Sequence, residues 1–321
     1  SPFGTSISMA FIDSAVNLSS TDDQTDCIEH FTCLGDWVRF AASAMDAHQV
    51  FFGHGFDSGW DESVFLCMRA LDLDWDAPPE VLSATLLPRE RRLLWTLIGR
   101  RCLERIPTAY LLEEAWFCGE PFRVTPDVLI PRSPIAELIE ARFSPWLSHS
   151  PTRILDLCTG SGCIGIAMAR AFPDARVDLS DLSDAAVSIA VDNVDQKDLG
   201  YQVRVLQGDL FATLEGEQYD LIVANPPYVD EDDLATMPAE FHHEPRLGLA
   251  AGHDGLELVH RILREAPQYL TDEGWLVCEV GNSFGALTTA YPDMDLHWPD
   301  FERGGHGVFL VSAAELRMHF A

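Results

Sequence analysis

The segment Asn225-Pro226-Pro227-Tyr228 holds a carboxamide and a phenol ring on a rigid turn. It follows the apolar run 220–224, which predicts a buried strand, and the two prolines end that strand. Because proline has no backbone N–H, the turn offers carbonyl acceptors and few donors. Such a turn can accept hydrogen bonds from a planar –NH2 group and stack a ring on it. We therefore expect Asn225, Pro226 and Tyr228 to be catalytic, and all four residues to bind substrate.

A glycine-containing loop about 65 residues earlier is a second candidate site. It follows the apolar run 153–157 and leads at once into a predicted helix, whose first N–H groups can face a carboxylate. Glycine allows a ligand to approach the backbone closely. A G-x-G pattern alone is weak, and a nicotinamide dinucleotide is a competing ligand, but that cofactor has no use for the Asn225 turn. The residues of this loop expected to bind a cofactor are Asp156, Cys158, Thr159, Gly160, Ser161 and Gly162.

Two more carboxylates follow later predicted strands. Asp181 ends the strand 175–180, where it can accept hydrogen bonds from both hydroxyls of a ribose. An alternative role as a helix N-cap suits Ser183 better. Asp209 and Leu210 follow the strand 201–207. Because ligands of doubly wound sheets lie beyond the carboxyl ends of the strands, we expect these residues in the same cofactor site as the glycine loop.

Alternating strands and helices must position these residues. Strands are expected at 153–157, 175–180, 201–207, 219–224, 274–280, 295–301 and 307–312, and helices at 162–171, 183–195, 255–270 and 283–290. This alternation predicts an α/β fold with a parallel, doubly wound sheet. The hairpin-like connection at 303–306 predicts that one strand near the carboxyl terminus is antiparallel.

The first part of the chain has a different pattern. Apolar residues recur at helical spacing between residues 10 and about 116, which predicts a helical domain over 10–119. A hairpin linker is expected up to about 130, and the catalytic domain over 131–321. Met9 is a candidate start of the natural chain, so residues 1–9 are expected to lie outside the fold.

Several stretches resemble one enzyme family, the ribosomal-protein glutamine methyltransferases. They include Gly53-His54-Gly55, Ala115-Trp116-Phe117, the Pro131-Arg132 segment and the regions 35–40, 243–252, 254–258, 279–283 and 304–309. The related release-factor glutamine methyltransferases share the glycine loop, the Asn225 turn and the Pro-Arg segment, but lack the Gly-His-Gly and Ala-Trp-Phe stretches. One departure is Gly165, where a bulkier apolar residue is usual. We expect it to affect packing only.

The resemblance implies a seven-stranded, Rossmann-like methyltransferase that uses S-adenosylmethionine. In that family the position of Asp156 takes the amino group of the methionine part, Asp209 and Leu210 lie against adenine, and Pro131 and Arg132 form the pocket wall. The implied reaction is N5-methylation of a glutamine in large-subunit ribosomal protein L-three. A peptide chain release factor is the alternative substrate. Adenine in nucleic acid is a further one, because adenine-N6 methyltransferases also carry Asn-Pro-Pro-Tyr.

The charge of the chain bears on the choice of partner. Its formal net charge is −30, and Lys197 is the single lysine. Phosphate binding needs clustered cations, so this composition argues against DNA and favours a basic protein substrate. Genomic bias and adaptation to high salt would also produce the acid excess. One arginine-rich helix, expected over 90–105, is interpreted as a solvated face, with an RNA-docking surface as the alternative.

The remaining patterns are mainly negative. The eight cysteines have no C-x-x-C pair and no ligand-like spacing with histidine, so neither a disulfide framework nor a zinc site is expected. His242-His243-Glu244 looks like a metal motif, but neighbouring residues on a strand point opposite ways. No signal peptide or membrane span is visible, so the cytoplasm is the expected compartment. The oligomeric state stays open, with a homodimer as one alternative.

Overall fold

A computed structural model describes residues 15–227, 237–245 and 256–320. Residues 1–9 and Tyr228, for which the sequence made predictions, lie outside this described part. The chain divides into two compact units between Leu112 and Glu113. Among the described residues, no helix has both the length and the apolar character needed to cross a membrane.

The first unit is helical. Its helices are α2 (Thr21–His30), α3 (Leu34–Ala47), α4 (Gly59–Ala70), α5 (Pro88–Cys102) and α6 (Thr108–Leu112), with a 3-10 helix at Pro79–Ser83. Ser20 and Ser58 cap α2 and α4 by accepting a backbone N–H three residues later. Leu34, Trp37 and Ala41 of α3 are fully buried, which confirms the helical periodicity of the sequence.

Three arginines of α5 and the loop after it bind groups of the first unit itself. Arg101 is 1% exposed, and its Nε donates to Glu62 at 3.0 Å. Arg91 donates to the carbonyl of Ile28, and Arg105 donates to the carbonyl of His48. These three guanidinium groups therefore join segments of the unit to one another. Arg89, Arg92 and Arg100 are exposed, and Arg100 pairs with Glu104, as expected for a solvated helix face.

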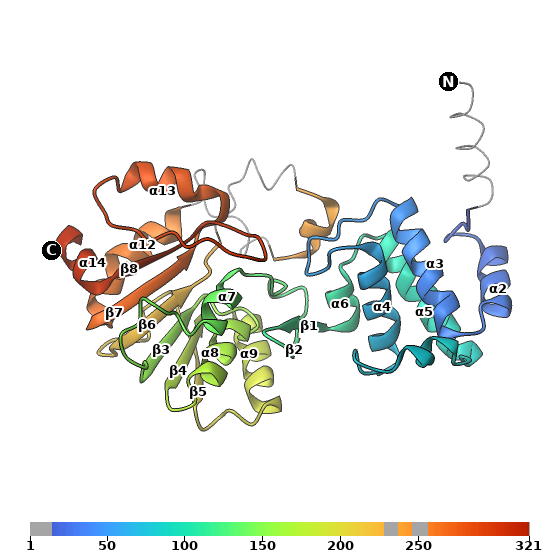
Figure 1. Cartoon of the computed structure of the whole chain (residues 1–321), viewed down its shortest axis with the longest axis horizontal. Coiled ribbons are helices and arrows are strands. Elements are labelled where there is room, and N and C mark those ends of the chain that lie inside the picture. The colour runs from blue at the N-terminus through green and yellow to red at the C-terminus, as the bar shows by residue number, and fades with distance from the viewer. Residues whose placement is uncertain (1–14, 228–236, 246–255, 321) are drawn as a thin grey trace, which may run out of the picture. The chain divides into compact units, whose positions relative to one another are not determined.

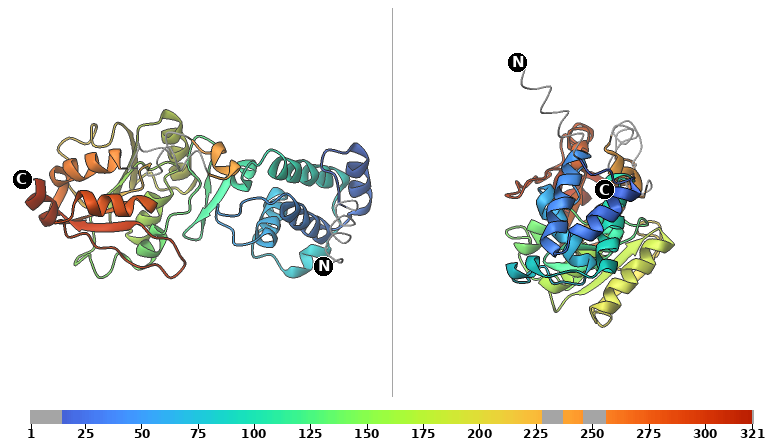
Figure 2. Two further views of the ribbon diagram at one scale, coloured as in Figure 1. Left: turned by 90° about the horizontal axis from the view of Figure 1, so that it is seen from above. Right: turned by 90° about the vertical axis from the view of Figure 1, so that its right-hand side faces the viewer.

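The second unit is built on one six-stranded sheet with the order β5-β4-β3-β6-β7-β8 (Figures 1 and 2). All neighbouring pairs are parallel except β7 and β8. The antiparallel strand near the carboxyl terminus is thus confirmed. The strands are β3 (Arg153–Leu157), β4 (Arg176–Asp181), β5 (Val203–Gln207), β6 (Tyr219–Ala224), β7 (Leu270–Glu279) and β8 (Val308–Ser312).

Helices cover both faces of this sheet. One face packs with α7 (Ile135–Glu140), α8 (Cys163–Ala171) and α9 (Asp184–Gln196) in one apolar core. The other face packs with α12 (Glu257–Glu265), α13 (Phe284–Ala290) and α14 (Ala313–Phe320) in a second core. A 3-10 helix at Ala266–Tyr269 follows α12. This three-layer arrangement is the predicted α/β fold.

One predicted strand is absent. The segment 295–301 forms no strand, and only His297 bridges to Leu310 of β8. Pro299 has no N–H to donate to a ladder, which limits regular pairing of this segment. The sheet of the described chain therefore has six strands, where seven were expected.

The predicted hairpin forms from β1 (Glu114–Phe117) and β2 (Glu120–Arg123). Phe117 and Phe122 are buried in the same core as α8 and α9. The hairpin is consequently part of the second unit, where the sequence analysis expected a linker. The burial of these two aromatic side chains is the physical reason.

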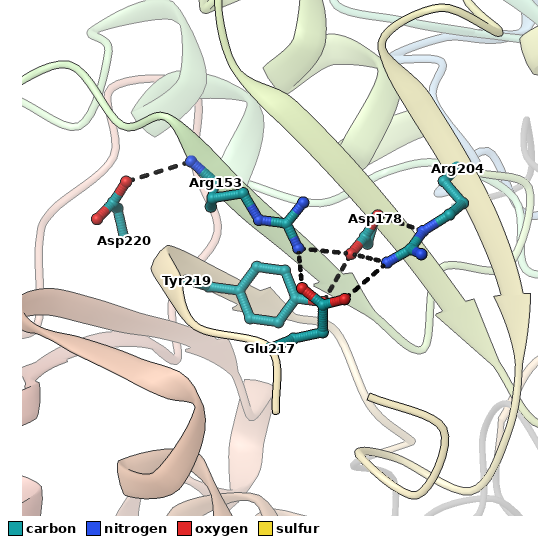
Figure 3. A network of polar contacts seen from close by, with 6 residues as sticks. All are labelled: Arg153, Asp178, Arg204, Glu217, Tyr219 and Asp220. Carbon is teal, nitrogen blue, oxygen red and sulfur yellow. Dashed lines mark hydrogen bonds and ion pairs between the residues drawn. The ribbon is translucent and has the colours of Figure 1, made fainter. Parts of the chain in front are cut away.

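A polar network lies toward the amino ends of the strands, away from their carboxyl ends (Figure 3). Its centre is the buried carboxylate of Asp178, which accepts from Arg204 Nε at 3.0 Å, Arg153 Nη2 at 3.1 Å and Tyr219 Oη at 2.7 Å. Glu217 also binds both arginines. A buried carboxylate is tolerated when it is paired and hydrogen-bonded in this way. The network thus ties β3, β4, β5 and β6 together.

Candidate active site

The carboxyl ends of β3, β4, β6 and β7 open into one cavity of about 530 Å³, within the range that small-molecule sites occupy. Most of the predicted site residues line it. Three of them, Asp156, Gly162 and Pro226, do not line it. The predicted residues that line the cavity are Pro131, Arg132, Cys158, Thr159, Gly160, Ser161, Asp181, Asp209, Leu210, Asn225 and Pro227.

The glycine loop has the backbone that the sequence predicted. Gly160 and Gly162 have φ values of 55° and 86°, in the left-handed region, and Gly162 is the N-cap of α8. A Cβ atom added to Gly160 would meet nothing within 4 Å, so the backbone there faces open space. Cys158 and Leu210, at φ values of 57° and 51°, are non-glycine residues in the same region. Such backbone often occurs at binding sites.

Asp156 lies beneath this loop and is fully buried. Its Oδ2 accepts from Thr159 Oγ1 at 2.6 Å and from the Gly165 N–H at 2.9 Å. Its Oδ1 is buried and has no partner among the described residues. Burial raises the pKa of this carboxyl to about 7. Through Oδ2, Asp156 therefore holds the loop to α8. Its Oδ1 can still accept a hydrogen bond.

Asp181 joins the loop to the second strand. Its Oδ2 accepts the Gly160 N–H at 2.9 Å, and its Oδ1 accepts the Ser183 N–H at 3.0 Å. Ser183 itself caps α9, as predicted, by accepting the Ala186 N–H. Each carboxylate oxygen has a second lone pair, so both remain able to accept a hydroxyl group from a bound ribose.

Asp209 has a partner that sequence reasoning missed. Both of its oxygens accept from Arg261 of α12, each at 3.1 Å, and Arg261 also lines the cavity. This fork fixes the plane of the carboxylate. The two residues are 52 positions apart, and no local pattern in the sequence pairs them.

The Pro-Arg segment is held by a buried carboxylate. Glu244, whose side chain is 0% exposed, accepts from Arg132 Nη2 at 2.9 Å. It also accepts the Ile130 N–H at 3.1 Å, and the Arg132 guanidinium lies 5.2 Å from the centre of the Phe241 ring. The segment that follows the Asn225 turn is thereby anchored to the cavity wall.

The structure gives Glu244, the last residue of the segment 242–244, a role in holding the Pro-Arg segment. The expectation of a strand at these residues is wrong, because Ala239–His243 form a 3-10 helix. Glu244 binds Arg132. Within residues 15–227, 237–245 and 256–320, no group of His, Cys, Asp and Glu side chains is arranged to hold a metal ion.

Asn225 directly follows the buried strand β6 and lines the cavity. Its Oδ1 is buried and has no hydrogen-bond partner in the described part of the chain. An unpartnered buried acceptor costs free energy unless a ligand satisfies it. The arrangement can therefore bind an N–H group at this position. Tyr228, the fourth residue of the turn, lies outside the described residues.

Comparison with known proteins gives consistent matches. The family model described as "Methyltransferase small domain" matches residues 143–243. A ribosomal protein uL3 glutamine methyltransferase of Francisella tularensis subsp. tularensis is 45% identical over 299 residues, which is 92% of this chain and 95% of that protein. The enzyme with the same description from Xanthomonas campestris pv. campestris is 46% identical over 287 residues, 89% of this chain and 93% of that protein.

Proposed function

The chain belongs to the family of the ribosomal protein uL3 glutamine methyltransferases, and on this basis we propose that it methylates the side-chain N5 of a glutamine in ribosomal protein uL3. Near-complete coverage of two relatives at 45% and 46% identity carries the proposal. The enzyme is a methyltransferase with a Rossmann-like α/β fold, and its methyl donor is S-adenosylmethionine. The partner is a basic protein of the large ribosomal subunit, met in the cytoplasm.

The residues of the cavity fit this donor. Asp156 does not line the cavity itself but lies beneath the glycine loop that does, and we assign its unpartnered Oδ1 to the methionine ammonium group. The open backbone of Gly160 leaves room for close approach. Asp181 would accept from the ribose hydroxyls, while Asp209 and Leu210 would bind adenine, with Arg261 fixing the carboxylate of Asp209. When bound, S-adenosylmethionine supplies an electrophilic methyl group on a sulfonium sulfur.

The acceptor nitrogen of a glutamine amide is a weak nucleophile, because its lone pair is delocalised into the carbonyl. Positioning is therefore the main task of the protein. Asn225 Oδ1 and the Pro226 carbonyl can each accept one N–H and so fix the plane of the –NH2 group. Both acceptors also stabilise the positive charge that develops on nitrogen. Tyr228 would stack on the amide. Orientation of this kind can lower a barrier by about 7–11 kcal/mol.

A transfer assay tests the proposal directly. Purified enzyme is incubated with tritiated S-adenosylmethionine and with uL3, a release factor or duplex DNA, and mass spectrometry locates the label. We expect one methylated glutamine in uL3 and no transfer to DNA. Label on the release factor in preference to uL3 would contradict the proposed substrate.

A further inference from the structure

Glu279 is a buried carboxylate next to Asn225 that the proposed chemistry has not used. It ends β7, it is 3% exposed and it lines the same cavity as Asn225. Ala224 is the register partner of Cys278 in the parallel β6–β7 pair. The next residues are Asn225, which directly follows β6, and Glu279, the last residue of β7. Neighbouring strands lie about 4.8 Å apart, which places the two backbones side by side.

Glu279 leaves the sheet on the side of α7 and α8, and both Glu279 and Asn225 line the cavity. Ala224 and Cys278 belong to the core that contains α12 and α14. Because successive residues of a strand alternate, Glu279 points to the opposite side from Cys278. Glu279 pairs with Val308, which belongs to the core of α7 and α8, in agreement with this direction.

A hydrogen bond between Glu279 and Ser133 supports the position of the Glu279 side chain at the cavity. Ser133 Oγ donates to Glu279 Oε1 at 2.6 Å, and the same Oγ accepts the Ile135 N–H at 3.1 Å. Ser133 also lines the cavity. Ser133 thus fixes the position of Glu279 Oε1.

We propose that Glu279 is a second catalytic residue, a carboxylate that stabilises the positive charge on the methylated amide nitrogen and takes its proton. This inference rests on the proposed function. The nitrogen lone pair forms a bond to the methyl carbon as the C–S bond breaks, and the electrons of that bond stay on sulfur. The nitrogen, now positive, releases one proton to Glu279, from which it passes to solvent. The products are the N5-methylamide and S-adenosylhomocysteine.

A matched pair of variants tests the proposal. Glu279→Gln keeps the shape of the side chain and an oxygen that can accept from Ser133, but it removes the charge. Ser133→Ala removes the hydrogen bond and leaves the carboxylate. General acid–base and charge-stabilising groups contribute about 100- to 10,000-fold. We expect kcat of Glu279→Gln to fall by about 100-fold or more and that of Ser133→Ala by about fivefold or less.

Binding measurements separate catalysis from structure. The Kd for S-adenosylmethionine, measured by calorimetry, and the KM for uL3 should stay within about threefold of the wild type in both variants. Glu279→Asp should retain more activity than Glu279→Gln, because it keeps a carboxylate.

Three outcomes would overturn the role of Glu279: a kcat of Glu279→Gln above a tenth of the wild-type value, equal losses in Glu279→Gln and Ser133→Ala, or a parallel loss of cofactor affinity in Glu279→Gln. Failure of the proposed function is a separate observation, since the wild type would then leave uL3 unmethylated.

Discussion

Asn225 is a half-buried asparagine and Asn193 a buried one, and their surroundings are opposite. The Oδ1 of Asn225, a residue that lines the cavity, is buried and has no partner in the described chain, whereas Asn193 donates to the carbonyls of Ser161 and Arg123 and accepts the Arg123 N–H. This contrast separates a side chain kept for a ligand from one that holds the fold together.

Replacing each asparagine by alanine should therefore have different effects. For Asn225→Ala we expect methyl transfer to fall by about 100- to 1000-fold, the size seen when one stabilising contact to a developing charge is removed. Its free energy of unfolding should change little. Asn193→Ala should lose about 1–3 kcal/mol of stability, because it leaves backbone groups unpaired. Radiolabel transfer and urea unfolding measure the two effects, and wild-type turnover in Asn225→Ala would contradict the assignment.

Asp156 should make the stability of the apo-protein depend on pH. Burial raises the pKa of its carboxyl from 3.8 to about 7. As pH rises above 4, the unfolded chain loses this proton while the folded chain keeps it. The stabilising contribution is therefore complete below pH 4 and is lost as pH rises toward 7.

Asp156→Asn has no such proton and serves as the reference. Between pH 5 and 8 the wild type should lose about 2–3 kcal/mol of unfolding free energy relative to the variant, at about 1.4 kcal/mol per pKa unit. Denaturant titrations at both pH values measure the difference. Parallel pH profiles of the two proteins would show that Asp156 is ionised in the folded state.

At the scale of elements, α8 packs unusually close to β4 at Gly165. A Cβ atom there would lie 2.0 Å from Leu179 Cδ2 and 3.1 Å from Asp156 Cβ. The absence of a side chain at this position therefore lets the helix approach the sheet and lets the Gly165 N–H reach Asp156. Gly165 is the position where the family usually has a bulkier residue, and Leu179 is the side chain that such a residue would contact.

A double-mutant cycle tests this packing. Gly165→Ala should be destabilising by about 1–3 kcal/mol through overpacking, and Leu179→Ala by about 2–5 kcal/mol through its cavity. The double variant should be more stable than the sum of these losses predicts, because each change relieves the other. Gly99→Ala in α5 is the matched control: an added Cβ meets nothing there, so a gain of about 1 kcal/mol is expected. Strict additivity at 165 and 179 would rule out the contact.

The elements of the second unit could largely be predicted from the sequence because their apolar runs are short and clearly bounded. β3, β6 and α8 begin and end within a residue of the expected positions. The segment 295–301 has the aromatic residues typical of a strand. It forms only the single bridge through His297, because Pro299 cannot donate a hydrogen bond to a ladder. The sequence pattern shows which residues are apolar, but it does not show which backbone N–H and C=O groups form hydrogen bonds with a neighbouring strand.

The site was only partly predictable for a related reason. Residues that follow strands, such as Asp181 and Asn225, could be placed because parallel strands end at the same edge. Ser133 and Arg261 line the cavity, and Glu244 binds Arg132 of its wall. Each makes contacts with residues far away in sequence, from 52 positions for Arg261 to 146 for Ser133. No spacing rule in a single sequence identifies such pairs.

At the scale of the whole molecule, the first unit is the proposed determinant of substrate choice. The resemblance implies that the glycine loop and the Asn225 turn are shared with the release-factor glutamine methyltransferases, whereas the Gly53-His54-Gly55 stretch of the helical unit is not. A chimera joined between Leu112 and Glu113, with the amino-terminal domain of a release-factor enzyme, should methylate a release factor in preference to uL3.

Competition between the two substrates in one tube measures the preference of the chimera. The reciprocal chimera, which carries residues 1–112 on the release-factor catalytic domain, is the control. If the first chimera still modifies only uL3, the second unit selects the substrate and this account of specificity is wrong.

Because several arginines form ion pairs within the protein, they do little to offset its negative charge toward the solvent. Arg101, Arg153 and Arg204 face the protein's own carboxylates, in a chain whose net charge is already −30. Mobile cations from the solution must therefore gather around the enzyme. A basic protein that binds the enzyme would displace these ions, and the resulting gain in their entropy would favour association. The KM for uL3 should consequently rise as the salt concentration rises, because added salt screens the attraction and reduces what the released ions gain.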